Sequence, residues 1–256
     1  MPPQHQPGGV GPPDAHRAAR GSSVTVAVMT DTPTAPLPPG RVLDHVSGGV
    51  RPSWRGVSHA VTLALAAPAS VWLFTHAAAH RAELGVYLGA LLAVLAVSAS
   101  YHLLTRSARS QQVMSRIDRG AIFALIAGTY TPIVAITVPA PYSVLMLVAV
   151  WTLAAAAATS RILARLPRLS SAMYVVVGWL AVLVVPWLLP APWLLAGLLA
   201  GGISYSVGAV LFALRRPRGI DGVFGFHEVF HLFTLGGIAA HFACVSALVL
   251  VTATVT

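Results

Sequence analysis

Long apolar runs separated by short polar or proline-containing breaks dominate the chain after residue 50. A helix that crosses a bilayer needs about 20 mostly apolar residues, and seven runs of about this size are present. They cover residues 57–76, 85–104, 119–138, 142–160, 171–189, 193–213 and 227–250. The pattern therefore predicts an all-α integral membrane protein, folded as a bundle of seven transmembrane helices.

The composition identifies the solvent that surrounds these helices. Hydrophobic residues make up 56% of the 256 positions, and charged residues only 9%. A soluble domain carries about 25% charged residues, so we expect membrane lipid to be the environment and partner of this chain. The net charge of +9 does not indicate a nucleic-acid partner, because the arginines lie in short loops between apolar runs.

The arginines also predict the orientation of the bundle, because positively charged loops stay on the cytoplasmic side. Arginine groups precede the first run and follow the second, fourth and sixth, whereas Arg81 stands alone on the opposite side. The groups contain Arg51, Arg55, Arg106, Arg109, Arg116, Arg119, Arg161, Arg165, Arg168, Arg215, Arg216 and Arg218. We expect a protein of the plasma membrane with its N-terminus in the cytoplasm and its C-terminus outside.

Residues 1–50 differ from the rest of the chain, since they are rich in proline, glycine and small polar residues without helical or strand periodicity. Such a composition is typical of disorder. We expect a disordered cytoplasmic tail over residues 1–50 and a seven-transmembrane domain over residues 51–256. The sequence leaves open whether translation starts at Met1 or Met29.

A small set of ionisable side chains falls inside the predicted spans, where such groups are costly in free energy and usually mark a site in the bundle interior. The set is His59, His102, Asp118, His227, Glu228, His231 and His241. Because the spans alternate in direction, His102, Asp118, His227 and His231 fall at cytoplasmic helix ends. Residues far apart in the sequence are thus expected at one membrane depth.

Three histidines in this set have the pattern of a metal site. His227 and His231 are four residues apart, so they share one face of a helix and can both bind one ion. With Glu228 they spell His-Glu-x-x-His, which supplies two zinc ligands in soluble zincins. His102 would complete a three-histidine site with an open position for water, and imidazole suits Zn²⁺ better than Mg²⁺ or Ca²⁺.

Two other residues are candidates for catalysis at this predicted zinc site. Asp118 lies at the same depth and is the better candidate for holding or deprotonating the water, because Glu228 is rotated by about 100° from His227 on its helix. Ser98 lies one turn before His102. Its hydroxyl either orients the site or bonds to its own helix backbone.

The remaining two histidines have different expected roles. His59 lies at the inner end of the first span and is a candidate outer partner of the ligands. His241 lies about 15 Å deeper than His231, too far to bind the same ion. We expect it to hydrogen-bond to a neighbouring helix.

Several motifs follow one another in an order that resembles the hemolysin III family, bacterial relatives of the progestin and adiponectin receptors in a superfamily that includes alkaline ceramidases. The motifs are SASYH at residues 98–102, Asp118, AGTYTP at residues 127–132, and FHEVFH at residues 226–231 followed by His241. The resemblance extends from about residue 50 to residue 256. One departure is Arg119, where bacterial members often have histidine.

The resemblance implies a seven-helix bundle in which His102, His227 and His231 hold Zn²⁺ near the cytoplasmic side, with Ser98 and Asp118 nearby. It also implies metal-dependent hydrolysis of a lipid amide, with Asp118 as the proton acceptor. Family membership does not settle function, so three interpretations stay open. They are a zinc-dependent lipid amidase or esterase at the inner leaflet, a sensor or regulator of membrane lipid state with structural zinc, and a cytolytic pore. The pore is ranked last because no span has a continuous polar stripe.

Overall fold

The structure, a computed structural model, describes residues 42–45, 49–164, 167–220 and 222–252. Within these residues the regular secondary structure is helical, apart from two isolated antiparallel bridges that join Leu43 to Val50 and Ile220 to Phe224. The helices are α1 (Val57–His76), α2 (Arg81–Leu104), α3 (Ala108–Thr137), α4 (Tyr142–Thr159), α5 (Pro167–Trp179), α6 (Val185–Leu188), α7 (Pro192–Ala213) and α8 (Phe226–Thr252). A π-helical turn (Ser160–Ala164) extends α4, and a 3₁₀ turn (Leu180–Val184) joins α5 to α6.

Six helices in the described part of the chain are long and apolar enough to cross a membrane, namely α1, α2, α3, α4 with its π-helical extension, α7 and α8. The prediction of an all-α integral membrane protein is confirmed. Helix α3 begins at Ala108 rather than at residue 119, because the Ser107 side chain accepts a hydrogen bond from the Ser110 backbone at 3.2 Å and caps the helix there.

The fifth predicted span, residues 171–189, is not one continuous helix but α5, the 3₁₀ turn and α6 in succession. Pro186 accounts for the change, since it has no N–H to donate to the preceding turn. The break needs partners for exposed carbonyl groups, and the Tyr130 hydroxyl of α3 lies 3.1 Å from Val177 O and 2.9 Å from Gly178 O. The central tyrosine of the AGTYTP motif therefore supports the broken span.

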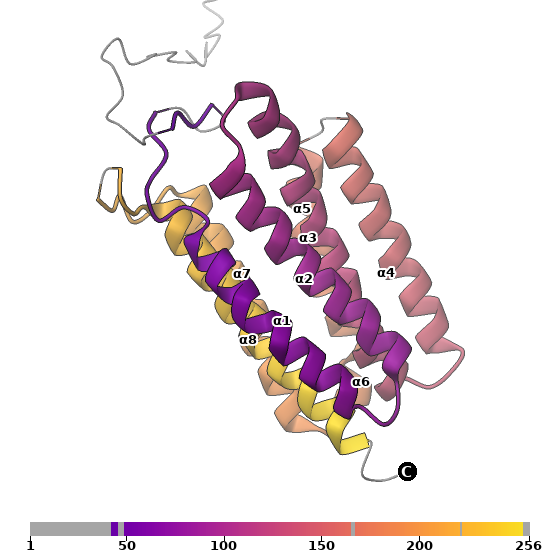
Figure 1. Ribbon diagram of the computed structural model, residues 1–256. Coiled ribbons are helices and arrows are strands. Elements are labelled where there is room, and N and C mark those ends of the chain that lie inside the picture. The colour runs from indigo at the N-terminus through magenta and orange to yellow at the C-terminus, as the bar shows by residue number, and fades with distance from the viewer. Residues whose placement is uncertain (1–41, 46–48, 165–166, 221, 253–256) are drawn as a thin grey trace, which may run out of the picture. The chain divides into compact units, whose positions relative to one another are not determined.

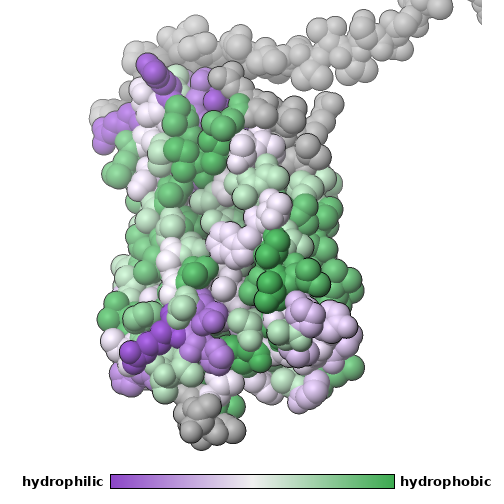
Figure 2. Space-filling model, turned by 90° about the vertical axis from the view of Figure 1, so that its right-hand side faces the viewer, coloured by the Kyte–Doolittle hydropathy of each residue, from purple (hydrophilic) through white to green (hydrophobic). Residues whose placement is uncertain are grey.

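The surface of the bundle has the distribution that a bilayer requires. Figure 2 shows a broad hydrophobic surface between hydrophilic patches at the two ends of the helices. Large apolar side chains such as Leu65 and Leu145 are exposed on this surface, where lipid chains would cover them.

Alternating helix directions bring the arginine-bearing segments to one end of the bundle (Figure 1). This end contains the starts of α1, α3 and α8 and the ends of α2, α4 and α7. Arg81, in contrast, begins α2 at the opposite end. Helices α1 and α8, the first and last among the described residues, pack against each other. We call this end of the bundle the arginine end.

Six residues that we expected to belong to the tail, 42–45 and 49–50, fold back on themselves before α1. Asp44 N donates to Gly49 O and Arg51 N donates to Val42 O, each at 2.9 Å. We call residues 42–45 and 49–55 the strap. Residues 1–41 of the predicted tail, with both Met1 and Met29, lie outside the described residues.

Candidate metal centre

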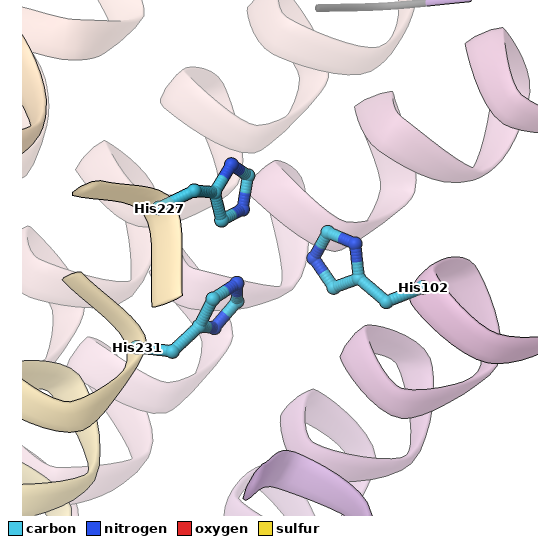
Figure 3. Close-up of side chains that lie close together, drawn as sticks. All are labelled: His102, His227 and His231. Carbon is cyan, nitrogen blue, oxygen red and sulfur yellow. The ribbon is translucent and has the colours of Figure 1, made fainter. Parts of the chain in front are cut away.

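Three histidines converge at the arginine end, and they come from two helices (Figure 3). His102 lies in the last turn of α2, while His227 and His231 lie one turn apart at the start of α8. Each offers one ring nitrogen, and these nitrogens all lie within 4.8 Å of one another. The helical spacing and the antiparallel packing together produce the cluster that the sequence predicted.

Two nitrogens of this cluster are buried without a hydrogen-bond partner. His102 Nε2 and His231 Nε2 contact no protein donor or acceptor in the described part of the chain, although their residues are only 3% and 4% exposed. An unsatisfied buried polar atom costs about 1–3 kcal/mol, so an apo centre would be unfavourable. A cation bound by these lone pairs removes the cost, and the cluster therefore fits a metal ion.

The size of the cluster also fits a tetrahedral ion. Zinc–nitrogen bonds of about 2.0–2.1 Å put tetrahedral ligand nitrogens about 3.4 Å apart, so small ring rotations would bring the three nitrogens to that spacing. The ring centroids are already 4.7 Å apart for His227 and His231 and 4.9 Å apart for His102 and His231. Three ligands leave one tetrahedral position open.

The two residues that the sequence suggested for catalysis lie near each other. The Ser98 side chain, buried one turn before His102 on α2, lies close to the Asp118 carboxylate of α3. The carboxylate of Asp118 is therefore beside the helix that carries His102.

Glu228, the second residue of the His-Glu-x-x-His pattern, faces away from the histidines. Its Oε1 accepts a hydrogen bond from Arg55 Nε at 2.8 Å, and its Oε2 accepts one from Gly225 N at 2.7 Å. The second bond satisfies a free backbone donor at the start of α8. Glu228 is therefore anchored as a structural residue, in line with its expected rotation away from the ion.

Comparison with known proteins now assigns the chain to a family. The model of a family described as "Haemolysin-III related" matches residues 49–242, which is most of the chain and includes all three histidines. The chain belongs to the haemolysin III family. The resemblance inferred from the motifs is confirmed.

Members of the haemolysin III family with curated names are similar over most of their length. Hemolysin-3 of Bacillus cereus is 33% identical over 210 residues, which cover 77% of this chain and 91% of that protein. A Hemolysin-3 homolog of Bacillus subtilis (strain 168) is 31% identical over 201 residues, covering 74% and 90%. A heptahelical transmembrane protein, ADIPOR2 of Oryza sativa subsp. japonica, is 30% identical over 183 residues, covering 64% and 80%.

In this haemolysin III protein the strap forms a charged layer above the histidines that the sequence did not reveal. Arg55 pairs with Asp44 of the strap and with Glu228 of α8, and all three side chains are buried. Arg51 NH1 donates to His102 O at 2.8 Å and to Thr105 O at 3.0 Å, which caps the end of α2. Burial lowers the pKa of the Arg51 guanidinium, while nearby Asp44 raises it.

From the sequence, Arg51 and Arg55 were expected only to mark the cytoplasmic side, and Asp44 was expected to belong to the tail. One available signal was the scarcity of acidic residues, since the chain has only seven. Three of those seven, namely Asp44, Asp118 and Glu228, gather at the arginine end. A rare acidic residue beside an apolar run is a reasonable candidate for a buried ion pair.

Replacing Arg55 by methionine is expected to destabilise the protein, because two buried carboxylates would lose this cation. Removing one partner of a buried ion pair costs about 3–5 kcal/mol. Unfolding of the detergent-solubilised protein by added SDS, monitored by tryptophan fluorescence, measures the change. Arg109→Met is the matched control, since Arg109 is exposed near the same end. Equal stability of the two variants would show that the buried pairs contribute little.

Gly56, just before α1, leaves room for His102. Its φ of +84° is left-handed, and an added Cβ would overlap the Cβ of His102. Gly49 has a nearly identical φ of +82°, but an added Cβ there would have no neighbour within 4 Å. The two glycines therefore separate backbone strain from crowding at the histidine cluster.

We expect Gly49→Ala to cost only the left-handed strain of about 1–2 kcal/mol. Gly56→Ala should cost a further ~1–3 kcal/mol from crowding and should also weaken metal binding, because His102 must move. Isothermal titration with Zn²⁺ alongside SDS unfolding checks both effects. Identical zinc affinities for the two alanine variants would contradict the importance of this close approach.

The remaining expectations concern His241, His59 and Arg119. His241 Nε2 lies 3.2 Å from Leu198 O of α7, so the predicted bond to a neighbouring helix is present. His59 lies beside His231, with 3.3 Å between His59 Nε2 and His231 Nδ1. Arg119 bonds to Ser115 within α3 through both its Nε and its NH2, so the departure from histidine here adds no ligand to the cluster.

Proposed function

We propose that this haemolysin III protein is a zinc-dependent hydrolase that cleaves an amide or ester bond of a membrane lipid. The observation that carries the proposal is the three-histidine cluster, in which two buried Nε2 atoms have no protein partner in the described part of the chain. Structural zinc sites normally have four protein ligands, whereas three ligands and an open position are typical of catalytic sites.

The ligands that we propose are His102, His227 and His231. Imidazole nitrogen suits zinc, and no carboxylate belongs to the described cluster, as sites for Mg²⁺ or Ca²⁺ would require. When bound, zinc would supply Lewis-acid polarisation of the substrate carbonyl and a lowered pKa of water. The chain itself would supply the proton acceptor, Asp118, which lies close to the Ser98 hydroxyl.

A lipid substrate fits the surroundings of the centre. An apolar groove of about 420 Å³ runs between α1 and α8, with Val61, Leu232 and Leu235 in its lining and Trp54 at its strap end. Glu228, which faces away from the histidines, also lines the groove, so the groove lies along a different face of α8 from the cluster. We propose that an acyl chain occupies this groove while the polar part of the lipid lies at the arginine end.

The arginine end is the cytoplasmic end in this proposal, because positively charged loops are retained in the cytoplasm. The reaction would then take place at the inner leaflet of the plasma membrane. A single cysteine introduced at exposed Ser107, on the loop before α3, tests the orientation. We expect an impermeant maleimide to label this cysteine only after cell lysis. Labelling of intact cells would instead place the arginine end outside the cell. Cys244 is buried, so its background reaction should be low.

The function is tested by incubating purified protein with a panel of ceramides, N-acyl amino lipids, phospholipids and acylglycerols. We expect fatty acid release from one class, loss of release after treatment with a membrane-permeable chelator, and recovery when Zn²⁺ but not Mg²⁺ is added back. Mass spectrometry of the released fatty acid is the measurement. No release by zinc-loaded protein from any lipid in the panel would refute hydrolysis.

A second candidate function is a sensor or regulator of membrane lipid state, favoured by the origin of the ligands on two different helices. An ion bound by His102 of α2 and by the two histidines of α8 would act as a clamp between these helices. In that case the chelator would lower the thermal stability in proteoliposomes without any lipid turnover. A pore, suggested by the name of the Bacillus cereus relative, would instead release dye from liposomes at low protein density.

A further inference from the structure

His59 contributes a third helix to the surroundings of the centre. It lies in the first turn of α1, is only 4% exposed, and packs edge-on against His231 with 4.3 Å between the ring centroids. Its Nε2 lies 3.3 Å from His231 Nδ1, while His231 Nε2 has no protein partner. The two nitrogens of His231 thus have different surroundings, one facing His59 and the other facing the cluster.

This arrangement constrains where the protons lie. A histidine that binds a metal through Nε2 must offer a lone pair there, so its proton lies on Nδ1. His231 Nδ1–H then donates to His59 Nε2, which must be the unprotonated nitrogen of its own ring. His59 therefore carries its proton on Nδ1, the nitrogen that is buried without a partner in the described part of the chain.

We infer that His59 is a positioning residue that fixes the tautomer and ring orientation of His231 by accepting a hydrogen bond from its Nδ1–H. The inference rests on the proposed metal site. Metal-binding histidines usually donate their second N–H to a carboxylate, a backbone carbonyl or water. In this protein a neutral imidazole from α1 takes that place.

Two conservative substitutions separate hydrogen bonding from packing. Glutamine places its amide oxygen near the position of Nε2 in histidine, so His59→Gln can still accept the bond from His231. Asparagine is shorter and reaches only the position of Nδ1, so His59→Asn cannot. Both amides are polar and similar in size. If His59 only filled space, His59→Gln would have no reason to bind zinc more tightly than His59→Asn.

The experiment measures zinc affinity of the purified full-length protein by competition with a chromophoric chelator. We expect His59→Asn to bind Zn²⁺ about 10- to 100-fold more weakly than wild type, and His59→Gln to recover most of the affinity. His76→Asn and His76→Gln, at the exposed far end of the same helix, are the controls and should bind as wild type does. Visible absorption of the Co²⁺-substituted protein should change for His59→Asn and not for His59→Gln.

The inference would be overturned if His59→Asn bound Zn²⁺ as tightly as the wild type does. It would also be overturned if both His59 variants bound Zn²⁺ equally weakly while their metal-free forms unfolded at the same temperature. Absence of zinc binding by the wild type would overturn both this inference and the proposed function. Zinc binding without lipid turnover would refute only the proposed hydrolase activity. The affinities of the His59 variants would still decide the role of His59.

Discussion

His227→Ala is expected to abolish stoichiometric zinc binding and, with it, all release of fatty acid. The substitution leaves two protein ligands, His102 and His231, on separate helices. Changing an outer partner of a metal ligand already costs about 10- to 100-fold in affinity, so losing a ligand itself should cost more than about 100-fold. Metal analysis of the purified variant after dialysis, run beside the lipid assay, gives both readouts.

The matched control is His76→Ala, which removes an exposed histidine at the other end of α1. This variant should keep one zinc ion per chain and wild-type turnover. His227 is half-buried, so its loss should leave the fold largely intact, and circular dichroism verifies that point. One zinc ion per chain in His227→Ala would show that the metal lies elsewhere.

Asp118→Asn is expected to retain zinc and lose most of the catalytic rate. Asparagine has nearly the same shape, but it cannot take up a proton. General-base catalysis contributes about 10²–10⁴-fold, so kcat should fall by that factor while KM changes little. Initial rates of fatty acid release on the most reactive lipid, at saturating substrate, give the value.

Glu83→Gln is the control for Asp118→Asn, because it neutralises a carboxyl group in the first turn of α2, at the opposite end of the bundle. Its rate should equal that of the wild type. Full activity in Asp118→Asn would assign the proton to another group. Loss of zinc in the same variant would mean that Asp118 supports the metal rather than the chemistry.

Much of the fold and the histidine cluster could be predicted because both depend on short-range regularities. A run of apolar residues long enough to span a bilayer is visible locally, and alternating span directions then fix which helix ends meet. His227 and His231 share a face because they are four residues apart. His102 could be added because its span ends at the same depth, without knowledge of any contact.

Other parts of the site depend on contacts that no local pattern encodes. Asp44 lies in a stretch with the composition of a tail, and only its pairing with Arg55 shows that it is buried. The sequence could place His59 near the ligands, but the partner of each ring nitrogen follows from the crossing of α1 and α8. The broken fifth span follows from Pro186, whose effect inside an apolar run we did not anticipate.

The ion pair between Arg55 and Glu228 also has a consequence for biosynthesis, because its partners are 173 residues apart. Arg55 and Asp44 are only 11 residues apart, so they can pair while the rest of the chain is still being translated. Glu228 emerges from the ribosome together with His227 and His231, in the last helix that the structure describes. The ion pair and the histidine cluster are therefore completed in the same late step, and a nascent chain that stalls before α8 has neither.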